Sequence, residues 1–250
     1  MIPIKNTEQL NKMRAACRIT GEALLVAEEA IRPGISTKAL DGVIRAYIEK
    51  CGARPTFLGY GGFPGAACIS INDEVIHGIP SADRLLREGD IVKVDVGAFY
   101  RGFTGDAART FPVGKVSPEA EALMEATKQC FLLGAARAVA GGRIGDIGSA
   151  VEANARAHGY SVVRKFVGHG VGAELHEEPE VPNFGTAGRG VRLFPGMTLA
   201  IEPMVNAGGA EVRVLPDRWT VVTADGSLSA HYENTVAVTA DGPESLTDIK

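Results

Sequence analysis

The residues best suited to chemistry are four carboxylates that stand in or beside apolar, strand-like stretches of the chain. They are Asp95, Asp106, Glu202 and Glu233. A carboxylate inside an apolar strand costs free energy unless it is paired, hydrogen-bonded or bound to a metal ion. Taken singly, each is more simply a structural acid, and the two aspartates could pair with Lys93 or Arg109. Taken together, four such groups in one core would repel one another strongly at low dielectric constant.

One histidine adds a further possible metal ligand, and one predicted turn would bring two of the acids together. His169 stands among glycines in Gly168–Gly172 and would, on its own, be an ordinary loop residue. Asp95 and Asp106 are 106 − 95 = 11 positions apart, so a hairpin turning near Arg101-Gly102 would set them side by side. Four carboxylates and an imidazole suit Mn, Fe(II), Co or Zn. Two such ions about 3.5–4 Å apart form a known hydrolytic centre, and a single Mg or Ca site is the alternative.

Other hydrolytic signatures do not fit the sequence. His176-Glu177 begins like the zinc-protease motif HExxH, but position 180 is Glu180 and Pro179 would break the helix. The sequence contains neither a GxSxG nucleophile elbow nor a GxxxxGK[ST] phosphate loop. The residues therefore favour metal-assisted hydrolysis.

Composition limits the class of protein further. The 250 residues are 45% hydrophobic and 22% charged, which suits one large or two small domains and excludes a disordered chain. A formal charge of −4 opposes sustained nucleic-acid binding. The N-terminus lacks a signal-peptide pattern, and no apolar run approaches the roughly 20 residues of a membrane helix. Four scattered cysteines are typical of free thiols in a reducing compartment, so we expect a cytoplasmic protein without membrane partners.

Apolar spacing and capping residues predict the elements that position these side chains. Thr7 and Ser117 are the expected N-caps of the first and third helices. The expected helices run from Thr7 to Pro33-Gly34, from Ser36 to Gly52, from Ser117 to about Ala140 and from Asp146 to Ala157. The expected strands are Ala66–Ile71, Ile91–Tyr100, Gly102–Val113, Ser161–Val167, Thr198–Val205, Thr220–Ala224 and Asn234–Thr239.

The order of helix, helix and strands occurs twice along the chain. Matched positions at an offset of 107 are Gly34 with Gly141, Leu40 with Ile147, Ile44 with Val151 and Gly52 with Gly159. Chance explains the helices alone, but the shared order favours an internal duplication. No Pro/Ser-rich linker separates the parts, so residues 1–250 are interpreted as a single catalytic domain with halves of about 1–114 and 115–250. Two α+β halves facing each other would place a site on their shared axis.

Several motifs follow one another along essentially the whole chain. They are Cys68–Asn72, His77–Pro80, Asp95–Gly97, Gly105-Asp106, Gly168–Gly172, His176–Pro179 and Ile201–Pro203. Together they closely resemble type I methionine aminopeptidases of the bacterial-like form that has no N-terminal extension. The resemblance implies the α+β pita-bread fold of creatinase and the aminopeptidases, with two pseudo-symmetric halves around a central antiparallel sheet. It also implies that the protein removes the N-terminal methionine from nascent or newly made proteins whose second residue is small.

The resemblance assigns a role to each residue of the site. The implied metal ligands are Asp95, Asp106, His169, Glu202 and Glu233. Asp95 would chelate one of two divalent ions (Co, Mn, Fe or Zn) and His169 the other, Asp106 and Glu233 would bridge them, and Glu202 would also be the general base.

Two further histidines and a set of apolar residues would bind the substrate. His77 and His176 would hydrogen-bond it and support the tetrahedral intermediate. An apolar slot for the methionine side chain would be lined by Phe57, Tyr60, Phe63, Cys68, Leu175 and Trp219. Ordinary core packing is the alternative for the aromatic residues. Some family members carry Cys, Tyr and Phe at positions 57, 63 and 175, where the residues here are still apolar.

Other members of the same fold remain as alternatives. Prolidase and aminopeptidase P share the ligands but usually carry a large N-terminal domain, whereas only two helices precede His77 here. Type II methionine aminopeptidases carry a helical insertion, whereas Glu202 and Glu233 are only 233 − 202 = 31 positions apart. A binding module or a creatinase-like enzyme would have lost the metal ligands. The expected partners are N-termini of nascent polypeptides, and a transient ribosome contact follows from substrate logic alone. The family suggests a monomer.

Overall fold

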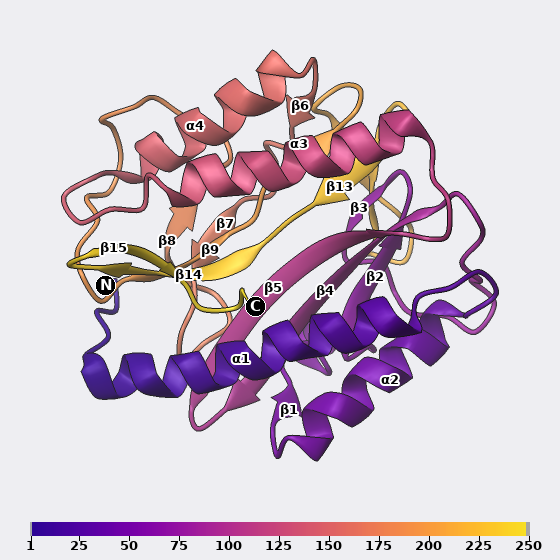
Figure 1. The fold of residues 1–250 in the computed structure, drawn as a ribbon, viewed down its shortest axis with the longest axis horizontal. Helices are drawn as coiled ribbons and strands as arrows, with labels where there is room; N and C mark the ends of the chain where they lie inside the picture. The colour runs from indigo at the N-terminus through magenta and orange to yellow at the C-terminus, as the bar shows by residue number, and fades with distance from the viewer. Residues whose placement is uncertain (1, 249–250) are drawn as a thin grey trace.

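The computed structural model describes residues 2–248, and its α-helices form two pairs. The first half of the chain supplies α1 (Thr7–Ala30) and α2 (Thr37–Lys50), and the second supplies α3 (Pro118–Ala135) and α4 (Ile144–Ala157). Figure 1 shows one pair on each side of the molecule, with the strands between them. Each pair buries its apolar stripe against strands of its own half, which is how amphipathic helices form a core with a sheet.

The sheet of the first half is built around one long hairpin. β4 (Ile91–Tyr100) and β5 (Phe103–Pro112) pair antiparallel, and β4 also pairs with β1 (Arg54–Pro55) and β2 (Ala67–Ile71). Arg101 and Gly102 have φ of 52° and 86°, so they form the two-residue turn that matches the twist of a hairpin. The register pairs Asp95 with Ala108 and Gly97 with Asp106. The two aspartates are therefore diagonal neighbours on one face, as the sequence predicts.

The strands of the second half form a five-stranded sheet in the order β15-β14-β9-β7-β8. Its members are β7 (Gly168–Gly170), β8 (Glu177–Val181), β9 (Thr198–Ile201), β14 (Asn234–Thr239) and β15 (Gly242–Ser245). Two three-stranded sheets complete residues 2–248, in the orders β13-β10-β6 and β11-β12-β3. Their members are β3 (Glu74–Ile76), β6 (Ser161–Val162), β10 (Met204–Asn206), β11 (Val212–Val214), β12 (Val221–Thr223) and β13 (Ser229–His231). Because β3 pairs with β12, this last sheet joins the two halves.

A second join between the halves lies at the centre of the molecule. The hydroxyl of Thr235 donates to the carbonyl of Asp106 over 2.9 Å and accepts from the Asp106 backbone N–H over 3.1 Å. The backbone groups of Glu233 and Ala108 exchange two further hydrogen bonds, of 2.9 and 3.4 Å. β5 is therefore tied to the start of β14, and the carboxylates of Asp106 and Glu233 are carried into one buried space.

The predicted elements are present, with shifted ends. Both halves run helix, helix and then strands, and the expected boundary near residue 114 lies in the loop between β5 and α3. The duplication itself stays a prediction. The N-cap of α1 is Asn6 rather than Thr7, because Asn6 and Gln9 each accept a hydrogen bond from the other's backbone N–H. The predicted cap Ser117 is confirmed, since its hydroxyl accepts from the Ala120 N–H.

Two boundaries of the second helix pair were also wrong. α3 ends at Ala135 rather than near Ala140, because the chain then turns back through Gly141, whose φ is 87°. α4 begins at Ile144 because Asp146 is the third helical residue, and its carboxylate accepts from the Arg143 N–H.

The strand expected over 198–205 is interrupted at Glu202-Pro203, since proline has no N–H to donate. Of the strand expected over 161–167, only the first two residues are in a strand, β6. All four cysteines are free, but Cys51 is only half-buried. Within residues 2–248, no helix has the length and apolar character needed to cross a bilayer.

Gly105 precedes Asp106 on β5 and allows α1 to lie directly on the strand. A methyl group there would be 2.6 Å from the Cys17 Cα and 2.7 Å from the Cys17 nitrogen. We predict that Gly105→Ala lowers the free energy of unfolding by about 1–3 kcal/mol, because the helix must move outward. Gly42→Ala, in α2 with nothing within 4 Å of the added carbon, should instead stabilise by up to about 1 kcal/mol. Urea unfolding measures both, and equal stability of the two variants would contradict the close approach.

Candidate active site

All thirteen residues that the sequence predicts for the site line a single cavity of about 140 Å³. They are Phe57, Tyr60, Phe63, Cys68, His77, Asp95, Asp106, His169, Leu175, His176, Glu202, Trp219 and Glu233. The residues numbered up to 106 come from the first half of the chain and the others from the second. The cavity therefore lies between the halves, with an acidic end and an apolar end.

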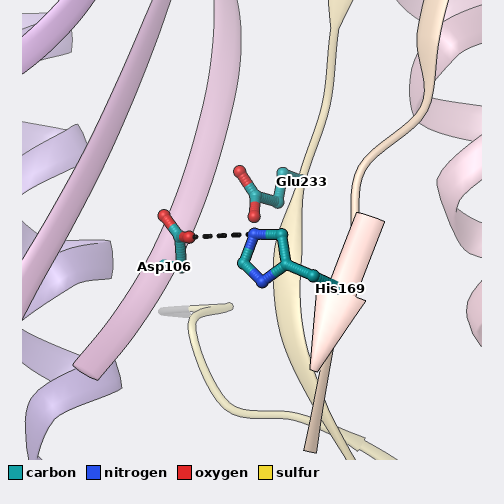
Figure 2. A group of neighbouring side chains, drawn as sticks. All are labelled: Asp106, His169 and Glu233. Carbon is teal, nitrogen blue, oxygen red and sulfur yellow. Dashed lines mark ion pairs between the residues drawn. The ribbon is translucent and has the colours of Figure 1, made fainter. Parts of the chain in front are cut away.

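Five side chains from different elements form the acidic end. Asp95 projects from β4, Asp106 from β5 and His169 from β7, while Glu202 follows β9 and Glu233 precedes β14. Nε2 of His169 lies 3.7 Å from Oδ2 of Asp106 and 3.6 Å from Oε1 of Glu202. Ligand atoms of Asp106, His169 and Glu233 all lie within 4.8 Å of one another. Figure 2 shows these three side chains pointing toward a common point from separate segments of the chain.

No cation of the described chain neutralises these acids by a direct hydrogen bond. Lys93 donates instead to the carbonyls of Asn72 and Ser229, over 2.7 and 3.0 Å. Arg109 donates to the carbonyls of Ala108 and Glu233 and, over 2.8 Å, to Oδ1 of Asn234. The alternative that Lys93 or Arg109 pairs with the aspartates is therefore wrong. Within residues 2–248, the buried oxygens without a hydrogen-bond partner include Asp95 Oδ1, Asp106 Oδ1 and Glu233 Oε1.

The protonation states follow from burial. Burial raises the pKa of Asp95 to about 7 and that of Glu202 to about 8. Burial, and then the neighbouring carboxylates, raise the pKa values of Asp106 and Glu233 well above their usual range. Burial lowers the pKa of His169 to about 3, so this imidazole is neutral at pH 7.

The donor set of the acidic end fits a divalent ion. Nδ1 of His169 lies 2.8 Å from the carbonyl of Gly170. An N–H at Nδ1 satisfies that carbonyl and leaves a lone pair on Nε2, the arrangement common in metal-binding histidines. Buried carboxylate oxygens without partners, together with one imidazole lone pair, are the ligands that first-row divalent ions take in proteins.

The apolar end is a compact cluster with one exposed member. Phe57, Phe63, Cys68 and Leu175 are each at least nine-tenths buried and pack with Trp219. Tyr60 is 45% exposed, so it stands at the mouth rather than in the slot. Its hydroxyl lies 2.7 Å from Nδ1 of His176. The structure thus brings the predicted slot residues together but gives Tyr60 a polar contact that an apolar role does not explain.

His77 and His176 also line the cavity, His77 beside Trp219 and His176 beside His169. Burial lowers the pKa of His77 to about 4, and burial also lowers the pKa of His176. The ring of His77 packs edge-on against Phe166 and Trp219, with ring centroids 6.0 and 6.3 Å away. Both imidazoles are therefore neutral near pH 7 and can act as hydrogen-bond donors without adding charge.

One residue of the site was missed by the sequence analysis. His231 is fully buried, and its Nε2 lies 3.6 Å from Oε2 of Glu202 and 4.0 Å from Oε2 of Glu233. Neither ring nitrogen has a hydrogen-bond partner among the described residues. The signal was present, because His231 stands two positions before Glu233, and side chains two apart on an extended segment point to the same side.

The comparisons with known proteins agree with this geometry. Residues 11–240 match the profile of metallopeptidase family M24. The fold and the acidic site thus define the class, and the chain belongs to metallopeptidase family M24.

Within that family, the chain groups with the methionine aminopeptidases. It is 53% identical to a methionine aminopeptidase from Clostridium acetobutylicum, over 99% of both chains. The crystal structure of a methionine aminopeptidase from Thermotoga maritima superposes with a TM-score of 0.98 at 42% identity, covering 100% of both chains.

Another solved structure shows the fold alone. Prolidase from Pyrococcus furiosus superposes with a TM-score of 0.80 at 24% identity, over 99% of this chain and 66% of that chain. The likeness to both enzymes confirms the predicted pita-bread fold.

The raised carboxyl pKa values make stability depend on pH and on divalent ions. A carboxyl group whose folded pKa exceeds its unfolded value of about 4 holds its proton longer in the folded state. The free energy of unfolding of the ion-free protein should therefore fall between about pH 6.5 and pH 8, where Asp95 and Glu202 titrate. Between about pH 4 and pH 6.5 the buried histidines, whose pKa values are lowered, offset the carboxyl groups. A bound cation replaces the carboxyl protons, so Co²⁺ or Mn²⁺ should raise Tm more at about pH 8 than at about pH 5.

Thermal unfolding of chelator-treated protein, with and without added ion, measures this difference. Asp106→Asn keeps the shape of the side chain, removes its charge and should abolish most of the ion-dependent rise in Tm. An equal rise at both pH values, or a full rise in the variant, would contradict the assignment of the acidic end.

Proposed function

We propose that the acidic end holds two divalent ions and that the cavity hydrolyses the peptide bond after an N-terminal methionine, in nascent or newly made chains whose second residue is small. The observation that carries this proposal is the cavity itself, in which partnerless buried carboxylates adjoin a closed apolar slot. Metal-assisted hydrolysis needs the carboxylates, and recognition of an unbranched apolar side chain needs the apolar slot.

Five residues would hold the ions. Asp95 would bind one ion and His169 the other, with Asp106 and Glu233 shared between them and Glu202 on the side of His169. The short separations from His169 to Asp106 and Glu202 support that grouping. When bound, divalent ions supply Lewis-acid stabilisation and make water nucleophilic near neutral pH. An imidazole in the set favours Co, Mn, Fe or Zn over a single Mg or Ca ion.

Glu202 would act as the general base. Its carboxylate lies on the cavity wall between His169 and His231, at 3.6 Å from an imidazole nitrogen on either side. From there it can accept a proton from the attacking water and donate it to the leaving amine. His77 and His176 would donate hydrogen bonds to the oxygen that becomes negative, an interaction that gains strength in a site closed to water.

The apolar end would bind the methionine side chain. Phe57, Phe63 and Leu175 exclude water from it, and the edge of Trp219 packs on Phe63 at a ring-centroid distance of 5.1 Å. The acidic end would take the free α-amino group, so a substrate can enter only by its terminus. Because only a chain terminus can bind in this way, a single residue would be removed. The cytoplasmic location, the monomeric state and the ribosome contact stay predictions.

Release of free methionine from a Met-Ala-Ser peptide tests the function directly. Chelator-treated protein should release none, and addition of Co²⁺, Mn²⁺, Fe²⁺ or Zn²⁺ should restore release. A formyl-Met peptide should not be cleaved, because its amine is blocked. Glu202→Gln should lower kcat by about 10²- to 10⁴-fold. Absence of methionine release with every ion, in folded protein, would overturn the proposal.

The second residue of the substrate should be small. A bulky side chain there would crowd the residues around the reacting bond, so Met-Ala peptides should be cleaved much faster than Met-Leu peptides. The measurement is kcat/KM for peptides that differ only at this position. Equal values for alanine and leucine would contradict the expected selectivity.

A further inference from the structure

Tyr60 and His176 face each other at the mouth of the cavity. The Tyr60 hydroxyl lies 2.7 Å from Nδ1 of His176, and the two ring centroids are 5.4 Å apart. Tyr60 belongs to η1 (Tyr60–Gly62), a single turn of 3-10 helix between β1 and β2, and His176 immediately precedes β8. The contact therefore joins residues 116 positions apart, one from each half of the chain.

The position of Tyr60 is set by its backbone rather than by apolar packing. Gly59 and Gly61, on either side of it, have φ of 85° and 56°, in the region that favours glycine. A methyl group at Gly61 would lie 3.2 Å from the ring of Trp219, so this turn rests directly on the wall of the slot. Phe57 is 7% exposed and Phe63 is 3% exposed, whereas Tyr60 is 45% exposed. Its ring therefore closes little of the slot, and its hydroxyl is the part held in place.

The hydroxyl decides which nitrogen of His176 carries the proton. A neutral imidazole has one N–H donor and one acceptor nitrogen. The phenol oxygen can accept from an Nδ1–H or donate to an Nδ1 lone pair; since a phenol O–H is a stronger donor than its oxygen is an acceptor, donation to Nδ1 is favoured, which leaves the hydrogen of the imidazole on Nε2. No other hydrogen bond is formed by either side chain within the described part of the chain. Nε2 is thus left with a free N–H, and His176 lines the cavity.

We propose that Tyr60 is a positioning residue that holds His176 in the tautomer able to donate from Nε2 to the substrate carbonyl. With the other tautomer, Nε2 would present a lone pair to an oxygen that gains negative charge, and the interaction would become repulsive. The same control of tautomer by a neighbouring group operates in hydrolases whose histidine is fixed by a carboxylate. The inference rests on the proposed function for its kinetic consequence, but the tautomer itself does not.

Tyr60→Phe separates the hydroxyl from the ring. We expect kcat for Met-Ala-Ser to fall about tenfold, the rate equivalent of one lost hydrogen bond, while KM changes less than about twofold because the ring is retained. In a His176→Ala background the same substitution should have no further effect, since residues that act as a unit are not additive. Tyr47→Phe is the matched control, because it removes a hydroxyl that donates to Glu22 over 2.6 Å between α2 and α1. It should leave kcat unchanged.

NMR of ¹⁵N-labelled histidine in the metal-free protein, at about pH 8 where free imidazole is neutral, reads the tautomer without catalysis. The His176 signals, identified by their loss in His176→Ala, should show hydrogen on Nε2 in the parent protein and a mixture of tautomers in Tyr60→Phe. Hydrogen on Nδ1 in the parent protein, or a Tyr60→Phe variant with unchanged kcat, would overturn the inference. If the parent protein releases no methionine although His176 carries its hydrogen on Nε2, the proposed function is refuted and the inference about the tautomer stands.

Discussion

The join between β5 and the chain around Glu233 determines where the rest of the active site lies. Thr235 and Asp106 exchange two hydrogen bonds, and Glu233 and Ala108 exchange two more. These bonds are buried, so breaking any of them would leave a polar group without a partner. They fix two carboxylates in one space despite their mutual repulsion. The two helix pairs of Figure 1 then cover the sheets from outside.

The protein concentrates negative charge at the centre and directs its buried cations elsewhere. Arg109 acts electrostatically on Glu233, yet Lys93 and Arg109 both donate mainly to backbone carbonyls. Burial therefore raises the carboxyl pKa values instead of being offset by an ion pair. A site arranged in this way favours divalent ions, because only added positive charge relieves the repulsion. The repulsion lowers the stability of the ion-free protein, and its relief when ions bind adds to the affinity of the site for those ions.

The sequence was informative wherever a local pattern determined the outcome. Strand alternation and the Arg101-Gly102 turn predict that Asp95 and Asp106 are neighbours. Apolar stripes predict the first two helices, and the start at Ser117 and the end at Gly159 predict the other two. Helix ends were less predictable, because a capping pair such as Asn6 with Gln9 differs little in sequence from other candidates. Contacts between distant segments, such as that of Thr235 with Asp106, leave no local pattern. The motifs predicted Tyr60 as an aromatic residue of the slot, but only the structure shows that its hydroxyl contacts His176.

The central join also has a consequence for the order of folding. Asp106 and Thr235 are 129 positions apart, so their contact closes a very long loop. Such contacts form late, after the local hairpin and helices have paid part of the entropy of ordering the chain. During synthesis, the first half can form α1, α2 and the hairpin well before Glu233 exists. A growing chain therefore carries two of the acids for some time without the others, and the centre can be completed only after Glu233 has been added.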